Sequence, residues 1–212
     1  MSDELINRLA VDLKPVRTTA LVERLALAVV AGLVLSAVAM WFWLGPRPDM
    51  AEATGTAIFW IKMGYTAILG LLGVWAVERL GRPGMSGRAP LACALAVFLL
   101  IMAAAIIAYT SAPAAARAPM LMGSTAAVCP LYVVALSLPL LVTVLTFMRK
   151  MAPSNPVWAG AGTGLATGAL GACVYSFHCT EQGLPFLASW YSLGIVAVVA
   201  LGALLGRLLL RW

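Results

Sequence analysis

The sequence predicts an all-α integral membrane protein, a bundle of six transmembrane helices preceded by a short cytoplasmic N-terminal helix. Of its 212 residues, 63% are hydrophobic and only 10% are charged, which is more apolar surface than one soluble core of this size could bury. Six apolar runs approach the length of about 20 residues that a helix needs to cross the hydrocarbon. The net charge of +6 is spread over the ends of these runs instead of forming one stripe, so nucleic acid is not an expected direct partner.

The polar head, residues 1–24, has a helical pattern of its own. Leu5, Leu9 and Leu13 recur at four-residue spacing and form one apolar stripe that ends at Pro15. A helix of about a dozen residues is marginal alone in water, so it needs a surface to fold on. That surface is either membrane lipid or the protein's own helices, or the head is a docking helix for another protein.

The six apolar runs are separated by loops with turn chemistry. They are residues 25–44, 57–77, 91–109, 127–147, 157–177 and 188–208. Gly and Pro mark the breaks between them. The first twenty residues are polar and mixed in charge, unlike a cleavable signal peptide, so we expect the first run to be a permanent span. An even number of spans places both termini on one side.

The distribution of basic residues predicts the orientation. Eleven of the fourteen Lys and Arg fall on one side: Arg8, Lys14, Arg17, Arg24, Arg79, Arg82, Arg88, Arg149, Lys150, Arg207 and Arg211. The other side has only Arg47 and Arg117. Because basic residues near span ends stay in the cytoplasm, both termini are predicted to be cytoplasmic and loop 171–191 to face outward. Lys62 lies inside a span, and we expect its long side chain to extend to the interface.

Small residues in the last two spans predict a close helix contact. Gly160, Gly164 and Gly168 repeat every four residues, and Gly202 and Gly206 repeat the pattern in the last span. Small residues let backbones approach closely where lipid removes the hydrophobic drive between helices.

The predicted topology sorts the four cysteines. Cys129 lies at the outer end of the fourth span and Cys179 lies in the last outward loop, so these two share one side, which is an oxidising compartment if it faces out. Consecutive spans tend to be neighbours, which favours their proximity. Cys173 lies about 9 Å deeper along its helix. Cys93 is at the opposite end of the third span and cannot reach the others.

The chemistry of Cys129 and Cys179 has three open interpretations: a structural disulfide, two free packed thiols, or a switch that responds to an oxidant or a metal. His178, the only histidine, precedes Cys179 and could lower its pKa or supply a nitrogen ligand. Soft metal ions prefer thiolate and thioether, and Met120 and Met122 lie on the same side. A soft metal ion at Cys129, Cys179 and His178 is the only cofactor that the sequence indicates. No Cys-x-x-Cys motif is present, which disfavours a dithiol enzyme.

Several stretches along the whole chain, in this order and spacing, match a known pattern. They are Asp12-Leu13-Lys14-Pro15-Val16-Arg17, Cys129-Pro130, Arg149-Lys150-Met151-Ala152-Pro153, Tyr175-Ser176-Phe177-His178-Cys179, Trp190-Tyr191 and Leu210-Arg211-Trp212. With them the chain resembles the NrsF-type membrane anti-sigma factors, negative regulators of an extracytoplasmic-function sigma factor. The resemblance departs at Thr18, where the family often has a further proline, and at Cys173, which is not a family position.

The resemblance implies a function for each part of the chain. A cytoplasmic segment, residues 1–24, would hold the sigma factor at the bacterial inner membrane, and residues 25–212 would form a six-helix sensor domain. The implied partner-binding residues are Leu5, Leu9, Asp12, Leu13, Pro15, Val16 and Arg17, and the implied sensing residues are Cys129, Cys179 and His178. Such a protein is a regulator and not an enzyme. The rival class, a membrane thiol oxidoreductase or soft-metal transporter, predicts turnover or flux that does not depend on residues 1–20.

Overall fold

The computed structural model describes residues 20–82, 84–151 and 153–211. The predicted head helix and its partner-binding residues lie outside these ranges. They are Leu5, Leu9, Asp12, Leu13, Pro15, Val16 and Arg17.

The described chain is helical, and its long helices follow the six predicted apolar runs. The elements are α2 (Ala20–Ala39) with the π-helical turn η1 (Met40–Leu44), α3 (Met50–Ala53), α4 (Ala57–Leu80), α5 (Arg88–Ser111), α6 (Ala114–Met122), α7 (Cys129–Met148), α8 (Pro156–Tyr175), and α9 (Leu184–Phe186) with the π-helical turn η2 (Leu187–Tyr191) and α10 (Ser192–Leu209). Among the described residues, six helices are long and apolar enough to cross a membrane, counting α2 with η1 and α9 with η2 and α10. The predicted all-α class is confirmed.

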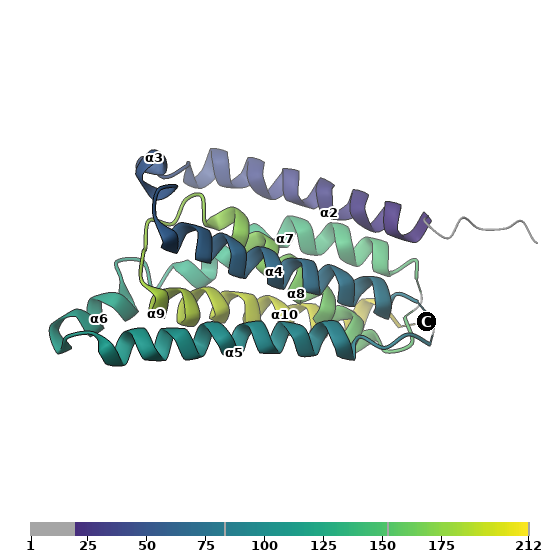
Figure 1. The fold of residues 1–212 in the computed structure, drawn as a ribbon. Coiled ribbons are helices and arrows are strands. Elements are labelled where there is room, and N and C mark those ends of the chain that lie inside the picture. The colour runs from purple at the N-terminus through teal and green to yellow at the C-terminus, as the bar shows by residue number, and fades with distance from the viewer. Residues whose placement is uncertain (1–19, 83, 152, 212) are drawn as a thin grey trace, which may run out of the picture.

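Helix α8 lies at the centre of the bundle (Figure 1). It packs against α4, α7 and α10, while α2 lies on α7 and α5 lies on α4. In the most apolar stretch of α8, 67% of the residues are buried, against 11% for α5. The central position of α8 follows from its small residues, because Gly and Ala let three neighbouring helices approach it at once.

The predicted close contact between the last two spans is confirmed. A methyl group added at Gly160 would overlap the carbonyl oxygen of Gly202, and one added at Gly164 would overlap that of Val198. On another face of α8, a methyl group at Gly73 of α4 would overlap the backbone of Ala166. These helices therefore meet backbone to backbone.

The bundle has two ends with different contents. The first, here the cysteine end, carries loops 45–56, 112–128 and 176–183 with the short helices α3, α6 and α9 (Figure 1). The second, here the terminal end, carries the start of α2, loops 81–87 and 149–155, and the C-terminus. The start of the described chain and its C-terminus thus lie at the same end, as an even number of spans requires.

The short helix α6 is not predicted by the sequence, in which Ala112-Pro113 indicates only a break. Pro113 stands at the N-cap of α6, where a proline loses no helical hydrogen bond. Arg117 of α6 donates from Nε to the carbonyl of Ala112 at 3.0 Å and from Nη2 to that of Thr110 at 3.0 Å. This cation therefore satisfies carbonyl groups at the C-terminal end of α5.

Candidate functional site: the cysteine cluster

Cys129 and Cys179 lie in one buried cluster at the cysteine end. Cys129, the first residue of α7, is 0% exposed, and Cys179, in the loop after α8, is 2% exposed. The rings of Tyr175 and Tyr191 pack in the same cluster. Both thiols are free. The structure thus places the two cysteines that the sequence paired in one buried cluster.

Local backbone geometry places both thiols. Helix α8 ends at Tyr175, whose carbonyl accepts hydrogen bonds from the backbone N–H of His178 at 2.9 Å and of Cys179 at 3.0 Å. This tight turn folds Cys179 back onto the end of α8. Helix α7 begins where the Cys129 N–H donates to the carbonyl of Thr125 at 2.9 Å. Pro130 follows in the first turn, where its missing N–H costs nothing.

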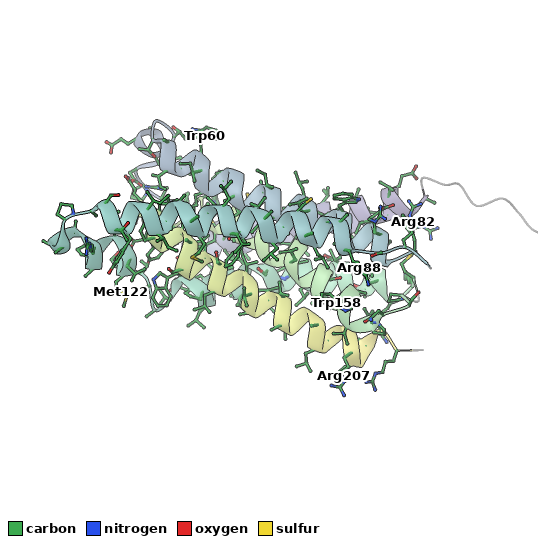
Figure 2. All side chains as sticks on the ribbon, turned by 60° about the horizontal axis from the view of Figure 1, so that its bottom comes forward. Trp60, Arg82, Arg88, Met122, Trp158 and Arg207 are labelled. Atoms are coloured by element: carbon green, nitrogen blue, oxygen red, sulfur yellow. The ribbon has the colours of Figure 1, made fainter. Side chains whose placement is uncertain are left out.

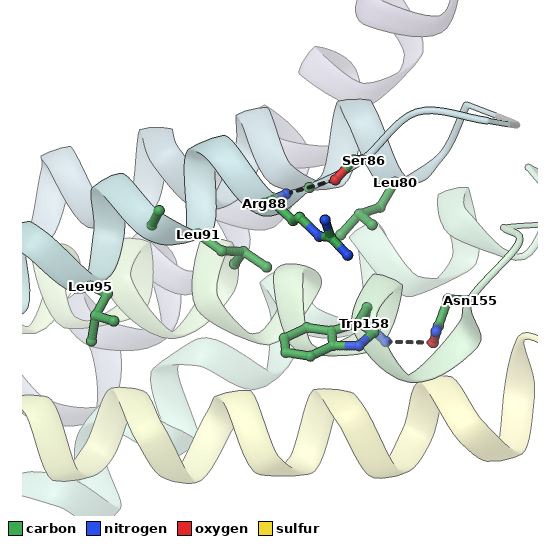
Figure 3. Close-up of a pocket in the computed structure, with 9 residues that line it drawn as sticks. Leu80, Ser86, Arg88, Leu91, Leu95, Asn155 and Trp158 are labelled. Atoms are coloured by element: carbon green, nitrogen blue, oxygen red, sulfur yellow. Dashed lines mark hydrogen bonds between the residues drawn. The ribbon is translucent and has the colours of Figure 1, made fainter.

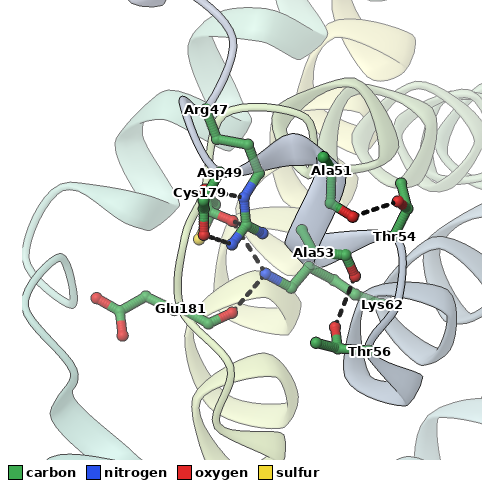
Figure 4. A network of polar contacts seen from close by, with 9 residues as sticks. All are labelled: Arg47, Asp49, Ala51, Ala53, Thr54, Thr56, Lys62, Cys179 and Glu181. Atoms are coloured by element: carbon green, nitrogen blue, oxygen red, sulfur yellow. Dashed lines mark hydrogen bonds and ion pairs between the residues drawn. The ribbon is translucent and has the colours of Figure 1, made fainter.

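Two buried cations, Arg47 and Lys62, bind backbone carbonyl groups of loop 176–183, here called the cysteine loop (Figure 4). We call this pair the cation clamp. Arg47 donates from Nη1 to the carbonyl of Cys179 at 3.1 Å, and its own N–H donates to the carbonyl of Phe177 at 3.0 Å. Lys62 donates from Nζ to the carbonyl of Cys179 at 3.3 Å and to that of Glu181 at 2.7 Å. The clamp therefore ties the loop to the segment after η1 and to α4.

The charge of Arg47 is neutralised locally. Asp49 accepts from Arg47 Nε at 2.8 Å and from Nη2 at 2.7 Å in a two-pronged ion pair. The hydrogen bonds between them raise the pKa of Arg47 and lower the pKa of Asp49. Arg47 is 4% exposed, so the residue that the sequence suggested only as a topology marker has a structural role.

The side chain of Lys62 extends to the loop at the cysteine end, and there it is buried. Its side chain is 2% exposed, and its Nζ lies 5.4 Å from the centre of the Tyr191 ring as well as on the two loop carbonyls. Among the described residues Lys62 makes no ion pair, so its charge is compensated by carbonyl dipoles and an aromatic face. The sequence could not show this, because the partners are backbone atoms of a distant loop.

His178 adds a further contact between the same loop and the segment after η1. Its Nδ1 donates to the carbonyl of Gly45 at 2.8 Å, and its ring packs edge-on against Tyr132 and tilted against Tyr175, with centroids 6.3 Å and 5.8 Å away. Gly45 has a φ of 73°, in the left-handed region that glycine tolerates. Within the described ranges no group of three or more His, Cys, Asp or Glu side chains is arranged to hold a metal ion. The metal-ligand role of His178 with the two cysteines stays a prediction.

Glu181 is a site residue that the sequence interpretation missed. Its Oε1 accepts hydrogen bonds from the N–H and the Oγ of Ser124, both at 2.7 Å, and from Thr125 Oγ1 at 3.2 Å. Burial alone would raise the pKa of this carboxyl, but these hydrogen bonds outweigh it and lower the pKa. Glu181 thereby joins the cysteine loop to the segment that leads into Cys129.

The other sulfur-bearing candidates lie apart from the pair. Cys173 is half-buried on α8, with its Sγ 4.0 Å from the Sδ of Met63 in α4. Cys93 is exposed near the start of α5, toward the terminal end. Met120 and Met122 lie on α6 outside the buried cluster, and Met122 is 49% exposed.

Comparison with known proteins identifies a family and two relatives that match almost the whole chain. Residues 9–212 match the family NrsF, described as negative regulator of sigma F. The chain is 41% identical over 212 residues to the anti-sigma-F factor NrsF of Caulobacter vibrioides, covering 100% of this chain and 99% of that one. It is 36% identical over 212 residues to the probable anti-sigma-F factor NrsF of Azospira oryzae, with the same coverage. No solved structure matches the chain.

Proposed function

Because the chain belongs to the NrsF family of negative regulators of sigma F, we propose that it is a membrane-embedded anti-sigma factor whose cysteine cluster controls release of its partner. The observation that carries the proposal is the full-length similarity to two proteins named as anti-sigma-F factors. The protein is accordingly a regulator and not an enzyme. The proposed partner is a sigma factor of the extracytoplasmic-function type.

The proposed membrane arrangement has six spans in a bacterial inner membrane, with the terminal end in the cytoplasm and the cysteine end outside. The six long apolar helices support the span number. The concentration of Lys and Arg at the terminal end supports the orientation. With this orientation the head emerges where a sigma factor would be found.

The head, residues 1–24, is the proposed docking segment. Leu5, Leu9 and Leu13 would form its apolar contact face, because an amphipathic helix without a partner is marginal in water. Asp12, Pro15, Val16 and Arg17 complete the segment that matches the family pattern.

Cys129 and Cys179 are the proposed sensor. Oxidation of the two thiols to a disulfide removes two electrons and two protons and requires Cα atoms within about 7 Å. Because both thiols are buried, an oxidant or a soft metal ion reaches them only when loop 176–183 opens. A change at Cys179 displaces the carbonyl that Arg47 and Lys62 both bind.

The cation clamp suggests how the signal leaves the cluster. Lys62 belongs to α4, which runs from the cysteine end to the terminal end, so loss of its contacts with the loop frees one end of a helix that packs on α8. The change must travel about 30 Å to reach the cytoplasmic face. A rigid helix with two packing positions is the kind of element that can transmit it.

Co-purification of a sigma factor with the full-length protein tests the proposal. Leu9→Asp or Leu13→Asp puts a charge on the proposed contact face, so we expect either variant to lose the sigma factor and to raise transcription of its target genes without a stimulus. The rival transporter or oxidoreductase class predicts no such dependence. Unchanged co-purification with both variants, at normal membrane abundance, would remove the head from the mechanism.

A further inference from the structure

A groove opens between α5 and its neighbours toward the terminal end. Helix α5 contacts α9 and η2 near the cysteine end, whereas along the rest of its length it packs on α4. Figure 2 shows α5 and α10 diverging toward the end at which Arg88, Trp158 and Arg207 lie. The groove has a section of about 650 Å³ at the terminal end, lined by residues of α5 and the start of α8, and a second section of about 290 Å³, which α10 also lines. The two sections share Leu91, Leu95 and Trp158, so the groove is continuous.

The second section is lined almost entirely by apolar side chains. Leu95, Phe98, Leu165 and Ile195 are among the side chains that line it. The hydroxyl groups of Tyr65 and Ser192 hydrogen-bond to each other, with 2.7 Å between their oxygens, and Trp158, which both sections share, adds an indole N–H. Water therefore gains few partners there, whereas a hydrocarbon chain would cover surface that is otherwise left unpacked.

The mouth of the groove has the opposite character (Figure 3). Arg88 is exposed, its guanidinium points toward α8, and it makes no ion pair among the described residues. Trp158 is 54% exposed below it. An indole and a guanidinium together are typical of the depth at which lipid headgroups lie. Asn155 adds a polar side chain, whose Oδ1 accepts a hydrogen bond from the backbone N–H of Trp158 at 3.2 Å.

The dimensions of the groove fit one leaflet. From Arg88 to Phe98, α5 rises by about 15 Å at 1.5 Å per residue. This is about half of the roughly 30 Å thickness of the hydrocarbon. A ligand with an anionic group at Arg88 and an apolar tail along Leu91 and Leu95 would therefore reach the mid-plane of the bilayer.

We propose that this groove is a binding site for one anionic glycerophospholipid of the leaflet at the terminal end. Its phosphate contacts Arg88, with Trp158 at the glycerol level, and one acyl chain fills the section lined by Leu95 and Ile195. The site rests on the proposed membrane insertion but not on sigma-factor binding or on the cysteines. The charge at the mouth and the apolar interior together select a lipid over a soluble anion, which would leave the interior unfilled.

Quenching of Trp158 tests the site. The full-length protein is reconstituted into phosphatidylcholine nanodiscs that contain a small fraction of lipid with brominated acyl chains, either phosphatidylglycerol or phosphatidylcholine. The signal of Trp158 is the part of the quenching that disappears in Trp158→Phe. We expect phosphatidylglycerol to bind about fivefold more tightly than phosphatidylcholine, the preference that one basic residue at an anionic surface provides.

Variants separate this site from lipid that merely surrounds the protein. Arg88→Gln should abolish the preference, whereas Arg149→Gln, the same change at an exposed terminal-end residue outside the groove, should preserve it. Ala161→Phe narrows the apolar section and should reduce quenching by both lipids. Equal quenching by the two lipids in the wild-type protein, or an unchanged preference in Arg88→Gln, would overturn the proposal. So would protection of Trp158 by a second copy of the chain, detected as cross-linking across the groove.

Discussion

The two ends of the bundle use the same residue types in opposite ways. At the cysteine end Arg47 and Lys62 are buried, and each donates to backbone carbonyls of one loop. At the terminal end Arg88 and Arg207 are exposed, and Arg88 lines the mouth of the groove. A buried cation fixes one backbone geometry, because its charge is tolerable only while its partners stay in place. An exposed cation is free to meet lipid or another protein.

This difference indicates that the two ends have different functions. The cysteine end is built to keep one loop closed over two thiols, and the terminal end is built to present charge. The following predictions test this contrast, from the largest expected effect to the smallest.

Labelling should separate the two ends completely. Met122 on α6 and Met85 in loop 81–87 are both exposed, at 49% and 40%. In a protein without native cysteines, we expect Met122→Cys to react with a membrane-impermeant maleimide applied to intact spheroplasts and Met85→Cys to react only after lysis, because the terminal end is cytoplasmic in our proposal. The reverse pattern would invert the topology.

Removing the buried cation should open the cysteine end. Lys62→Met leaves the Glu181 carbonyl without its Nζ donor, a loss of about 2 kcal/mol for a hydrogen bond to a charged group. This corresponds to about thirtyfold faster maleimide labelling of Cys179 in a variant that retains only that cysteine. Lys150→Met, the same change at an exposed residue of the terminal end, is the control. Equal effects of the two changes would erase the contrast between the ends.

The two cysteines of the cluster should act as one unit. Cys129→Ser, Cys179→Ser and the double variant should give the same loss of response in a transcription reporter, because coupled residues are not additive. We expect a weaker defect in His178→Ala, which loses the bond to Gly45 and the ring contacts with Tyr132 and Tyr175 but keeps both thiols. Cys173→Ser should be nearly neutral, since its thiol lies apart against Met63. A normal response in the double variant, at normal abundance, would leave the cluster without a sensing role.

The smallest expected effect is a pH dependence at Glu181. Since its pKa is lowered in the folded protein, this carboxylate contributes stability above its ordinary pKa of 4.5, and that contribution is lost as the pH falls through the lowered value. The Tm of the wild-type protein should therefore fall more steeply in acid than that of Glu181→Gln. Glu52→Gln, at an exposed residue of α3, is the control and should keep the wild-type profile.

The sequence was informative where periodicity or topology alone decides the outcome. Long apolar runs predicted the helices, because a run of about 20 residues can satisfy its own backbone in lipid by forming a helix. The four-residue repeat from Gly160 predicted the close contact of α8 with α10, because only small residues permit it. The proximity of Cys129 and Cys179 followed from their position on neighbouring spans at the same end.

The sequence failed where the partner is a backbone atom brought near by folding. Lys62 looks like any lysine near a span end, and only the folded loop places the carbonyls of Cys179 and Glu181 within its reach. Arg47 was interpreted from charge alone, yet Asp49 and the loop bury it. No sequence motif identifies Glu181, because its hydrogen-bond donors are Ser124 and Thr125, turn residues that lie far from it in the sequence.

The contact between α8 and α10 has a consequence for conformational entropy. Gly160 and Gly164 meet Gly202 and Gly206 without any side-chain rotamer to immobilise, and Gly and Ala lose no rotamer freedom on burial. A contact of this kind can shift along its length without the repacking that interlocked Leu or Phe side chains would require. We therefore expect α10 to change its position against α8 at a low entropic cost while the rest of the bundle keeps its side chains in place.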